Sequence, residues 1–370
     1  MPQGSKKKRR FTLQIITACI VSLFLASCGS VSKKIPGPVH PTVWDSAKSI
    51  RYVKTIDVVG LGSDDLIKRV LVGSDEQELV KPVAIALRGS TMIIADTGPV
   101  VIDAGMVIKD MQERISRVKL GLHDKGATVF YKYDLNTERM TVLRGTGMHF
   151  ADEISDIYLA EDYTFYVTDV DGRRVLKFSP QGKLLKVYQH PPNIFRPIAV
   201  TVDEIAKEVL IADETYSKIV SFDMDKAEPK YGMGERGSGG QGQFRIITDM
   251  IPVPDGFLVS DRIELRVQML DRKGGFIANF GQGIVTFPTA LAIDKENRIF
   301  VSDKADSTIK IFKAGKLIDT VGSNGYGRGE FRHISDMKVL NNNLYVVDSL
   351  NGRIQVFEFV SSSENVALVQ

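Results

Sequence analysis

The sequence predicts an all-β fold, a six-bladed β-propeller, from three observations. A short apolar strand that ends in Asp occurs six times, the copies follow one another at similar intervals, and further strand-like segments follow each copy. The gaps between the six Asp residues are 73, 44, 48, 42 and 45 residues. Repeats of this length are supersecondary units that bury their apolar faces only when they stack on neighbouring copies. The copies end at Asp96, Asp169, Asp213, Asp261, Asp303 and Asp348.

The first 27 residues have the pattern of a secretory leader. Residues 6–10 are all basic, and residues 11–25 form a mostly apolar run that is too short to span a membrane comfortably. The sequence Leu25-Ala26-Ser27-Cys28 then resembles the bacterial lipobox, which implies that Cys28 is lipidated and becomes the new N-terminus. We therefore expect residues 1–27 to be a lipoprotein signal peptide.

An incidental cysteine beside an ordinary cleavage site is the alternative interpretation of Cys28. The chain has two cysteines, and the other, Cys19, lies inside the leader. Cys28 would then be the one thiol of an extracytoplasmic protein, unable to form an internal disulfide. This cysteine usage favours lipidation, and several acyl chains on one terminus anchor a protein stably without a transmembrane helix.

The residues after Cys28 predict where the protein is held. No later segment has 18 uninterrupted apolar residues, so the body is not expected to span a membrane. Gly29 rather than Asp follows the cysteine, which by the lipoprotein resemblance implies the outer membrane, facing either the periplasm or the cell surface. Residues 28–48 contain Pro36, Pro38 and Pro41 and predict an extended tether.

The charge of the chain gives no indication of nucleic-acid binding. The leader holds five of the 48 Lys and Arg residues and no acidic residue, so the mature charge is 43 − 45 = −2. The sequence pI of 8.6 is therefore a property of the leader.

The propeller itself is expected over residues 49–360, followed by a polar tail at 361–370. Residues 52–60 form a spare strand at the start of the body, whereas the last repeat contains only three strands and lacks the outermost one. We expect the N-terminal strand to complete the last blade, which closes the ring of a monomeric propeller and covers two sheet edges.

The long first gap indicates an insertion in the first blade. Residues 130–134 match the third strand of the other repeats, so about 28 extra residues lie between the second and third strands, within residues 97–126. Apolar residues at positions 107, 108, 111, 115 and 118 suit a short amphipathic helix. The insertion is either a flap packed on the propeller or a partner-binding lid.

The repeats also indicate a family. Five copies align on the Asp without a gap, with a basic residue or Thr five positions later and Phe or Leu nine positions later. β-Branched and aromatic residues at these positions are strand signals. The copy at residues 345–357 closely resembles the NHL repeat, and the resemblance covers roughly residues 50–360. It implies a propeller of four-stranded blades and no particular activity, because propellers host many unrelated functions.

The strand-end Asp residues are expected to be structural. Each precedes a turn, where its carboxylate accepts backbone N–H groups or pairs with the basic residue five positions later. A role that recurs in every blade favours this interpretation over catalysis.

A second set of acidic residues offers a candidate site near the axis. If every second blade presents a carboxylate, three carboxylates converge and could hold a divalent cation or a cationic ligand, because hard cations take oxygen ligands. Tyr158 and Lys338 lie two residues beyond an Asp and would point the same way. The alternative is that each Asp caps a local turn. The three Asp residues of this set belong to the predicted start positions of the inner strands, which in blade order are Pro82, Asp156, Pro197, Asp249, Pro288 and Asp336.

Common catalytic motifs do not occur in the chain. Residues 232–237 fit the dinucleotide fingerprint by letter only, and the five His residues show no metal-ligand spacing. We therefore expect a non-enzymatic binding propeller without a cofactor, which holds a protein or polysaccharide partner in the envelope. The alternative is a metal-dependent enzyme, a lactonase-like hydrolase or a lyase, with a divalent cation at the axial Asp residues. Lactonase relatives also place a Glu and an Asn at the metal, and matching positions are not found here.

Overall fold

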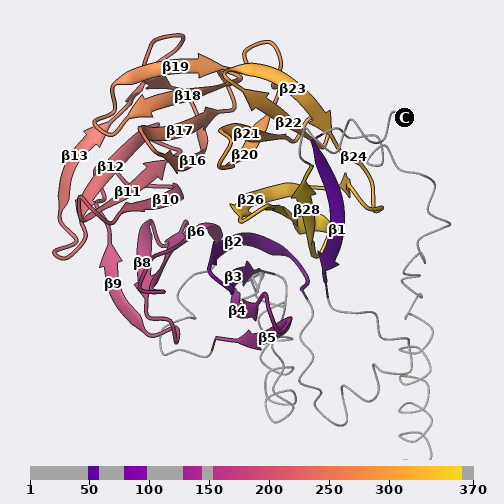
Figure 1. The fold of residues 1–370 in the computed structure, drawn as a ribbon. Helices are drawn as coiled ribbons and strands as arrows, with labels where there is room; N and C mark the ends of the chain where they lie inside the picture. The colour runs from indigo at the N-terminus through magenta and orange to yellow at the C-terminus, as the bar shows by residue number, and fades with distance from the viewer. Residues whose placement is uncertain (1–48, 58–78, 98–127, 144–152, 361–370) are drawn as a thin grey trace, which may run out of the picture. The chain divides into compact units, whose positions relative to one another are not determined.

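Six antiparallel sheets of four strands surround a central axis in the computed structural model (Figure 1). The structure describes residues 49–57, 79–97, 128–143 and 153–360, all within a unit that spans residues 41–370. The all-β class and the six blades predicted from the repeat are confirmed within these ranges. The one helix in them is η3 (Ser349–Asn351), a single 3-10 turn, and none is long and apolar enough to cross a membrane.

Each blade runs from an innermost strand a to an outermost strand d. Blade 1 comprises β2 (Pro82–Arg88), β3 (Thr91–Asp96), β4 (Val129–Asp134) and β5 (Arg139–Val142). Blade 2 comprises β6 (Ile154–Leu159), β7 (Phe165–Asp169), β8 (Arg174–Phe178) and β9 (Leu184–Tyr188). Blade 3 comprises β10 (Pro197–Asp203), β11 (Glu208–Asp213), β12 (Lys218–Asp223) and β13 (Pro229–Met233).

The second half of the ring continues in the same order. Blade 4 comprises β16 (Ile247–Val253), β17 (Gly256–Asp261), β18 (Arg266–Asp271) and β19 (Phe276–Phe280). Blade 5 comprises β20 (Pro288–Ile293), β21 (Arg298–Asp303), β22 (Thr308–Lys313) and β23 (Lys316–Val321). Two small parallel ribbons lie in the connections before blades 4 and 6: β14 (Glu235–Arg236) with β15 (Gln243–Phe244), and β24 (Ser323–Asn324) with β25 (Glu330–Phe331).

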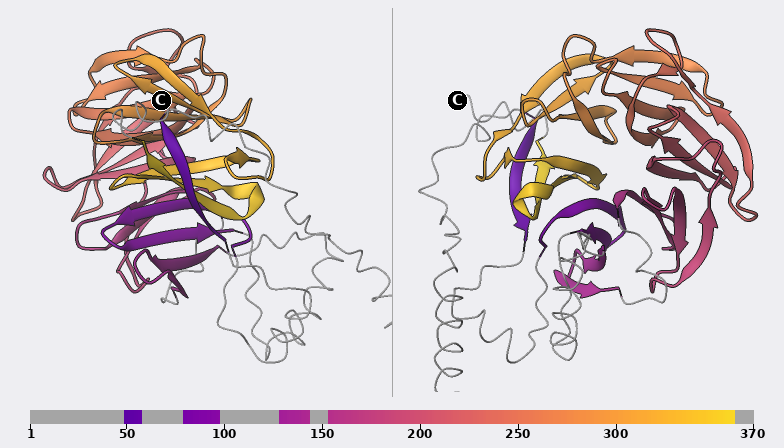
Figure 2. Two further views of the ribbon diagram at one scale, coloured as in Figure 1. Left: turned by 45° about the vertical axis from the view of Figure 1, so that its right-hand side comes forward. Right: turned by 180° about the vertical axis from the view of Figure 1, so that it is seen from behind.

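Blade 6 combines the two ends of the chain. Its inner strands are β26 (Ile334–Leu340), β27 (Asn343–Asp348) and β28 (Arg353–Phe359). Its outermost strand is β1 (Ile50–Ile56), which runs antiparallel to β28 with Ile50 opposite Phe359 and Ile56 opposite Ile354. Figure 2 shows the indigo β1 beside the yellow strands from both directions. The strand at the N-terminal end of the body thus covers the edge of β28 that would otherwise be open.

The core lies between the blades. All six residues of β3, β11 and β17 are buried, because each sheet packs between two others. Short continuous apolar runs are typical of such strands. Aromatic rings fill the space between blades: Phe130 of blade 1 lies 6.2 Å from the ring of Phe165 in blade 2, and Phe300 of blade 5 lies 5.3 Å from Phe359 in blade 6. Such pairs bury a large apolar area between neighbouring sheets.

Within the described residues, buried strand-end Asp carboxylates accept N–H groups from the start of strand a in five of the blades. Asp213, for example, accepts the N–H groups of Phe195 at 2.7 Å and Arg196 at 2.6 Å. In the remaining blade, Asp169 accepts the N–H of Gly172 and pairs with Arg174. The Asp of the repeat therefore holds backbone in place and lies below the surface of the ring. The other residues that accept two N–H groups from the start of strand a are Asp96, Asp261, Asp303 and Asp348.

Several predicted features lie outside the described residues. These are the leader, Cys28 and the tether, the tail at residues 361–370, and the helix predicted within the blade 1 insertion. Of that insertion, residues 97–126, the structure describes Thr97.

Candidate functional site

The sheets correct the register that the sequence suggested for the axial Asp residues. Pairing with the strand-end Asp places Pro82 opposite Asp96 and Ile154 opposite Asp169, so this proline is level with Ile154 and not with Asp156. The prediction that Asp alternates with Pro was wrong by two residues, because each proline is the first residue of its strand whereas each Asp is the third residue of its strand. The position still alternates, with Asp against alanine: Ala84, Asp156, Ala199, Asp249, Ala290 and Asp336.

Each axial Asp joins its blade to the next one. Oδ2 of Asp156 accepts the N–H of Val200 at 2.9 Å, across from blade 2 to blade 3. Asp249 bonds in the same way to Leu291 at 2.7 Å, and Asp336 to Ile85 at 2.8 Å. The N–H that donates to the carboxylate always belongs to the residue after the alanine of the neighbouring strand. The carboxylates therefore cross-link alternate pairs of blades around the axis.

The ammonium of Lys338 lies among these carboxylates. Its Nζ donates to Oδ1 of Asp336 at 2.9 Å and to Oδ1 of Asp156 at 3.1 Å. Burial alone would lower the pKa of Lys338, but Asp156, Asp336 and Asp249 outweigh it and raise the pKa above its ordinary value. The chain itself thus supplies a cation at the place predicted for a bound one.

The carboxylates respond to the same surroundings. Burial raises the pKa of Asp249 to about 7; Lys338 opposes this shift, and the other two Asp residues add to it. Burial likewise raises the pKa of Asp336 to about 6 against the effect of Lys338. Among the described residues, no group of three or more His, Cys, Asp or Glu side chains has the arrangement of a metal site. The cluster is an internal network of three carboxylates and one ammonium.

Tyr158, the fifth predicted axial residue, lies apart from this network. Its hydroxyl donates to Glu204 at 3.3 Å. Burial raises the pKa of Tyr158 to about 12, and the nearby Glu204 carboxylate adds to the effect. Tyr158, Asp156 and Lys338 line a cavity of about 220 Å³ at the end of the axis where the inner strands finish.

A larger cavity of about 760 Å³ opens at the other end of the axis, where the inner strands begin and the second strands finish. We call it the upper pocket. The blades present side chains there from two positions, one before strand a and one after the strand-end Asp. A backbone hydrogen bond joins these positions, as between the N–H of Lys304 and the carbonyl of Phe287, at 2.9 Å. The charged residues of the lining are Lys81, Glu153, Arg196, Glu214, Arg262, Lys304 and Arg332.

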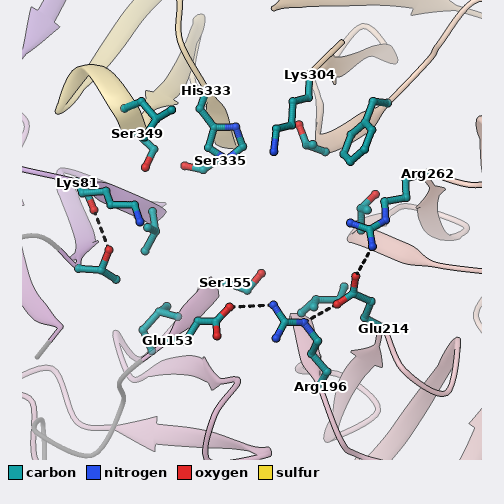
Figure 3. A pocket seen from close by; sticks show the side chains of 18 of the residues that line it. Lys81, Glu153, Ser155, Arg196, Glu214, Arg262, Lys304, His333, Ser335 and Ser349 are labelled. Carbon is teal, nitrogen blue, oxygen red and sulfur yellow. Dashed lines mark hydrogen bonds and ion pairs between the residues drawn. The ribbon is translucent and has the colours of Figure 1, made fainter. Parts of the chain in front are cut away.

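Cations outnumber anions in this lining by 5 − 2 = 3, with His333 counted as neutral. Along one wall the charges compensate one another (Figure 3). Arg196 donates to both Glu153 and Glu214, and Arg262 contacts Glu214 at 3.1 Å. The excess of positive charge is therefore carried by the remaining cations, which are Lys81, Lys304 and Arg332.

That opposite wall comes from blades 5, 6 and 1. It contains Lys304, His333, Ser335, Ser349 and Lys81, and Figure 3 shows them facing the pocket across from the Glu153–Arg196–Glu214 wall. Burial lowers the pKa of His333, and the charges of Lys304 and Lys81 lower it further, against the opposing effect of Asp348. The imidazole is therefore neutral at physiological pH.

Sequence reasoning missed the upper pocket. Its residues flank the repeated Asp and the start of strand a, but they differ from blade to blade, whereas a repeat is found from what its copies share. The sequence signal that could have indicated the pocket is the set of residues that differ between copies and lie next to the repeated Asp and the start of strand a.

Comparisons with known proteins support the fold. Residues 290–367 match a family described as a 6-bladed beta-propeller. A structural genomics protein of unknown function from Bacteroides thetaiotaomicron has a TM-score of 0.58 at 10% identity, over 84% of this chain and 76% of that one. A streptogramin B lyase has a TM-score of 0.55 at 7% identity, over 86% of this chain and 100% of that one. Virginiamycin B lyase from Staphylococcus aureus has a TM-score of 0.51 at 10% identity, over 77% of this chain and 97% of that one. At such identities the likeness shows the fold alone. No curated protein matches the chain.

Proposed function

We propose that this protein is a non-enzymatic binding propeller of the cell envelope, which holds an acidic protein or polysaccharide partner in its upper pocket. The observation that carries the proposal is the excess of three positive charges in a cavity of about 760 Å³. The mature chain has a net charge of 43 − 45 = −2, so this positive charge is local to the pocket.

The size and shape of the cavity support binding. Ligand pockets in proteins are typically clefts of about 300–1,000 Å³ with a few converging polar groups. An excess of one sign of charge in a cleft also raises the local concentration of oppositely charged ligands. Blades on all sides of the ring line the pocket, so a partner there would contact the whole ring at once.

The sequence supports the location. The basic run at residues 6–10, the apolar run after it and Cys28 fit a lipoprotein signal peptide. In this proposal lipidated Cys28 anchors the protein at the outer membrane and residues 28–48 form the tether. Incorporation of labelled palmitate, lost in Cys28→Ala and retained in Cys19→Ala, tests the anchor. Equal labelling of Cys28→Ala and wild type would refute it.

Binding to soluble polymers tests the pocket. The purified lipoprotein in detergent is titrated with polygalacturonate, with poly-glutamate and with neutral dextran of similar size. We expect one or both acidic polymers to bind and dextran not to bind. The affinity should fall as the salt concentration is raised from about 0.05 M to about 0.5 M, because salt screens the pocket charges. Absence of binding to both acidic polymers, or equal binding to dextran, would contradict the proposal.

The metal-dependent hydrolase or lyase is less well supported. It requires the axial carboxylates to be available to a divalent cation, and Lys338 donates to two of the three. The geometry favours an internal ion network at this position. A stoichiometric divalent ion in the purified protein, lost on Asp156→Asn substitution, would revive the enzymatic alternative.

A further inference from the structure

Blade 6 departs from blades 4 and 5 at the floor of the upper pocket. In blades 4 and 5, the residue before the axial position is a threonine whose hydroxyl is fully used. Thr248 Oγ1 lies 2.8 Å from Ser260 Oγ and donates to the carbonyl of Pro288 at 3.0 Å. Thr289 makes the same pair of contacts, to Ser302 Oγ at 2.7 Å and to the carbonyl of Ile334 at 3.2 Å.

In blade 6 the equivalent hydroxyl belongs to Ser335, and its strand partner is missing. The register places Asp336 opposite Val347, where the two other blades have Ser260 and Ser302. Valine has no hydroxyl, so Ser335 cannot make the pair that fixes Thr248 and Thr289. Its Oγ is buried and has no hydrogen-bond partner among the described residues.

Two more polar atoms of blade 6, both from residues that line the upper pocket, also lack a hydrogen-bond partner among the residues that the structure describes. Ser349 is 1% exposed, and neither its Oγ nor Nδ1 of His333 has a hydrogen-bond partner within the described part of the chain. All three residues line the upper pocket. Buried polar atoms are rarely left unpaired, because the loss of their hydrogen bonds to water is not compensated. Three together on one blade indicate a place where a ligand completes the hydrogen bonding.

Two uncompensated ammonium groups stand on either side of this blade. Lys304 comes from blade 5 and Lys81 from blade 1, and neither forms an ion pair with a described residue. The Lys304 ammonium lies over the face of the Phe287 ring, at 5.5 Å from its centre. Both ammonium groups are close enough to His333 to lower its pKa. Arg196 and Arg262, on the other wall, are already paired with carboxylates.

We propose that Lys81, Lys304, His333, Ser335 and Ser349 form a subsite for an oxyanion, either a carboxylate or a phosphate group. Two ammonium groups supply the charge, and hydroxyl groups between them supply directional donors, the combination that recognises such groups. The proposal rests on the proposed function, since it locates where an acidic partner is held. The proposed subsite lies at blades 5, 6 and 1. Arg196 and Arg262, which are already paired with carboxylates, do not contact the oxyanion in this proposal.

Calorimetric titration of the full-length lipoprotein with two small probes tests the subsite and distinguishes the two anions. Inorganic phosphate and galacturonate are the probes, and neutral galactose is the control. We expect one of the two anions to bind and galactose not to bind. Binding of phosphate alone assigns the subsite to phosphate groups, and binding of galacturonate alone assigns it to carboxylates. Failure of both anions to bind overturns the proposal.

Substitutions show whether the probe sits at this wall. Lys81→Met and Lys304→Met should each weaken binding about tenfold or more, because each removes a charge-assisted hydrogen bond. The matched control is Lys313→Met, an exposed lysine of blade 5 that pairs with Glu296 outside the pocket, and it should bind as wild type. Circular dichroism checks that the variants fold. Wild-type affinity in both Lys81→Met and Lys304→Met overturns the proposal.

The imidazole provides a second readout. An oxyanion beside His333 stabilises its protonated form, so the saturating probe should raise the pKa of His333 measured by NMR. The charged groups around this ring are Lys304, Lys81 and Asp348, and Asp348 is held by the N–H of Arg332 and does not line the pocket. An unchanged His333 pKa at saturation places the anion elsewhere and overturns the proposal.

The subsite and the proposed function can fail separately. If polygalacturonate binds wild type and the double variant Lys81→Met/Lys304→Met equally, the binding function stands and the subsite is wrong. If neither acidic polymer binds wild type but phosphate does, with the lysine dependence above, the subsite stands and the polymer-binding function is wrong.

Discussion

Replacement of Lys338 by Met should destabilise the propeller by about 3 kcal/mol at pH 8, the lower end of the range for a broken buried ion pair. The change keeps much of the side-chain volume and removes the ammonium that bonds to Asp156 and Asp336. The two carboxylates are 7% and 5% exposed and would be left without their cation. The lysine itself is 22% exposed, so water lessens the effect and the lower end applies.

The loss should shrink as the pH falls. The pKa of Asp249 is about 7 and that of Asp336 about 6, and both should rise further in Lys338→Met because the ammonium lowers them. A carboxyl whose folded-state pKa lies above its unfolded value adds stability as the pH falls through the folded-state pKa. The variant therefore gains protons on the buried Asp residues between pH 8 and pH 5, and the difference from wild type should narrow to about 1 kcal/mol.

Urea denaturation at pH 8, 6.5 and 5 measures this difference. Lys310→Met is the matched control, because Lys310 is also buried and bonds to two Asp residues, Asp303 at 2.6 Å and Asp306 at 2.9 Å. Burial would raise the pKa of Asp306, but hydrogen bonds from Lys310 and Thr308 outweigh it and hold the pKa below its ordinary value. The Thr308 hydrogen bonds remain in Lys310→Met, so the control should recover less stability at low pH than Lys338→Met. A loss for Lys338→Met that is the same at all three pH values would refute the assignment of raised pKa values to the axial Asp residues.

Three further outcomes are expected. Asp213→Ala should lower the free energy of unfolding by about 3 kcal/mol in a urea titration, because it removes the acceptor of three backbone N–H groups; a loss below about 1 kcal/mol would contradict its role. Gly256→Ala should lower the free energy of unfolding by at least about 2 kcal/mol, because φ is 156° and a Cβ would lie 1.9 Å from the carbonyl oxygen of Leu270. The same change at Gly239, which also has a positive φ but faces open space, should lower it less. Lys304→Met should raise the pKa of His333 toward its ordinary value in an NMR titration; an unchanged value would show that the two side chains do not interact.

Much of the fold could be predicted because its determinants are local. A buried strand followed by an Asp-containing turn recurs in every blade, and the carboxylate of Asp213 bonds to backbone only 17 and 18 residues away. Counting such units gives the number of blades. The strand at Ile50–Ile56 was recognisable as a fourth strand without a blade of its own, and β28 is the edge that it pairs with.

The axial cluster could be predicted only in part. The sequence indicated that alternate blades carry an Asp and that Lys338 shares its face, but the contact between Lys338 and Asp156 joins residues 182 positions apart. That contact depends on how the ring closes, and no local pattern contains this information. The register error has a similar origin, because proline marks the start of three strands, and pairing with the strand-end Asp is needed to align them with the other three.

The two ends of the axis differ in how their positive charges are used, and this difference decides where a partner binds. At the axial Asp residues, Lys338 is already bonded to two carboxylates, so an incoming cation or acidic group would have to displace an existing ion pair. In the upper pocket, Lys81 and Lys304 have no such carboxylate partner among the described residues, and the hydroxyl of Ser349 has no hydrogen-bond partner among them either. An acidic ligand gains new interactions there without breaking old ones. Because only interactions that are new on binding contribute to affinity, the upper pocket is the end that favours a ligand.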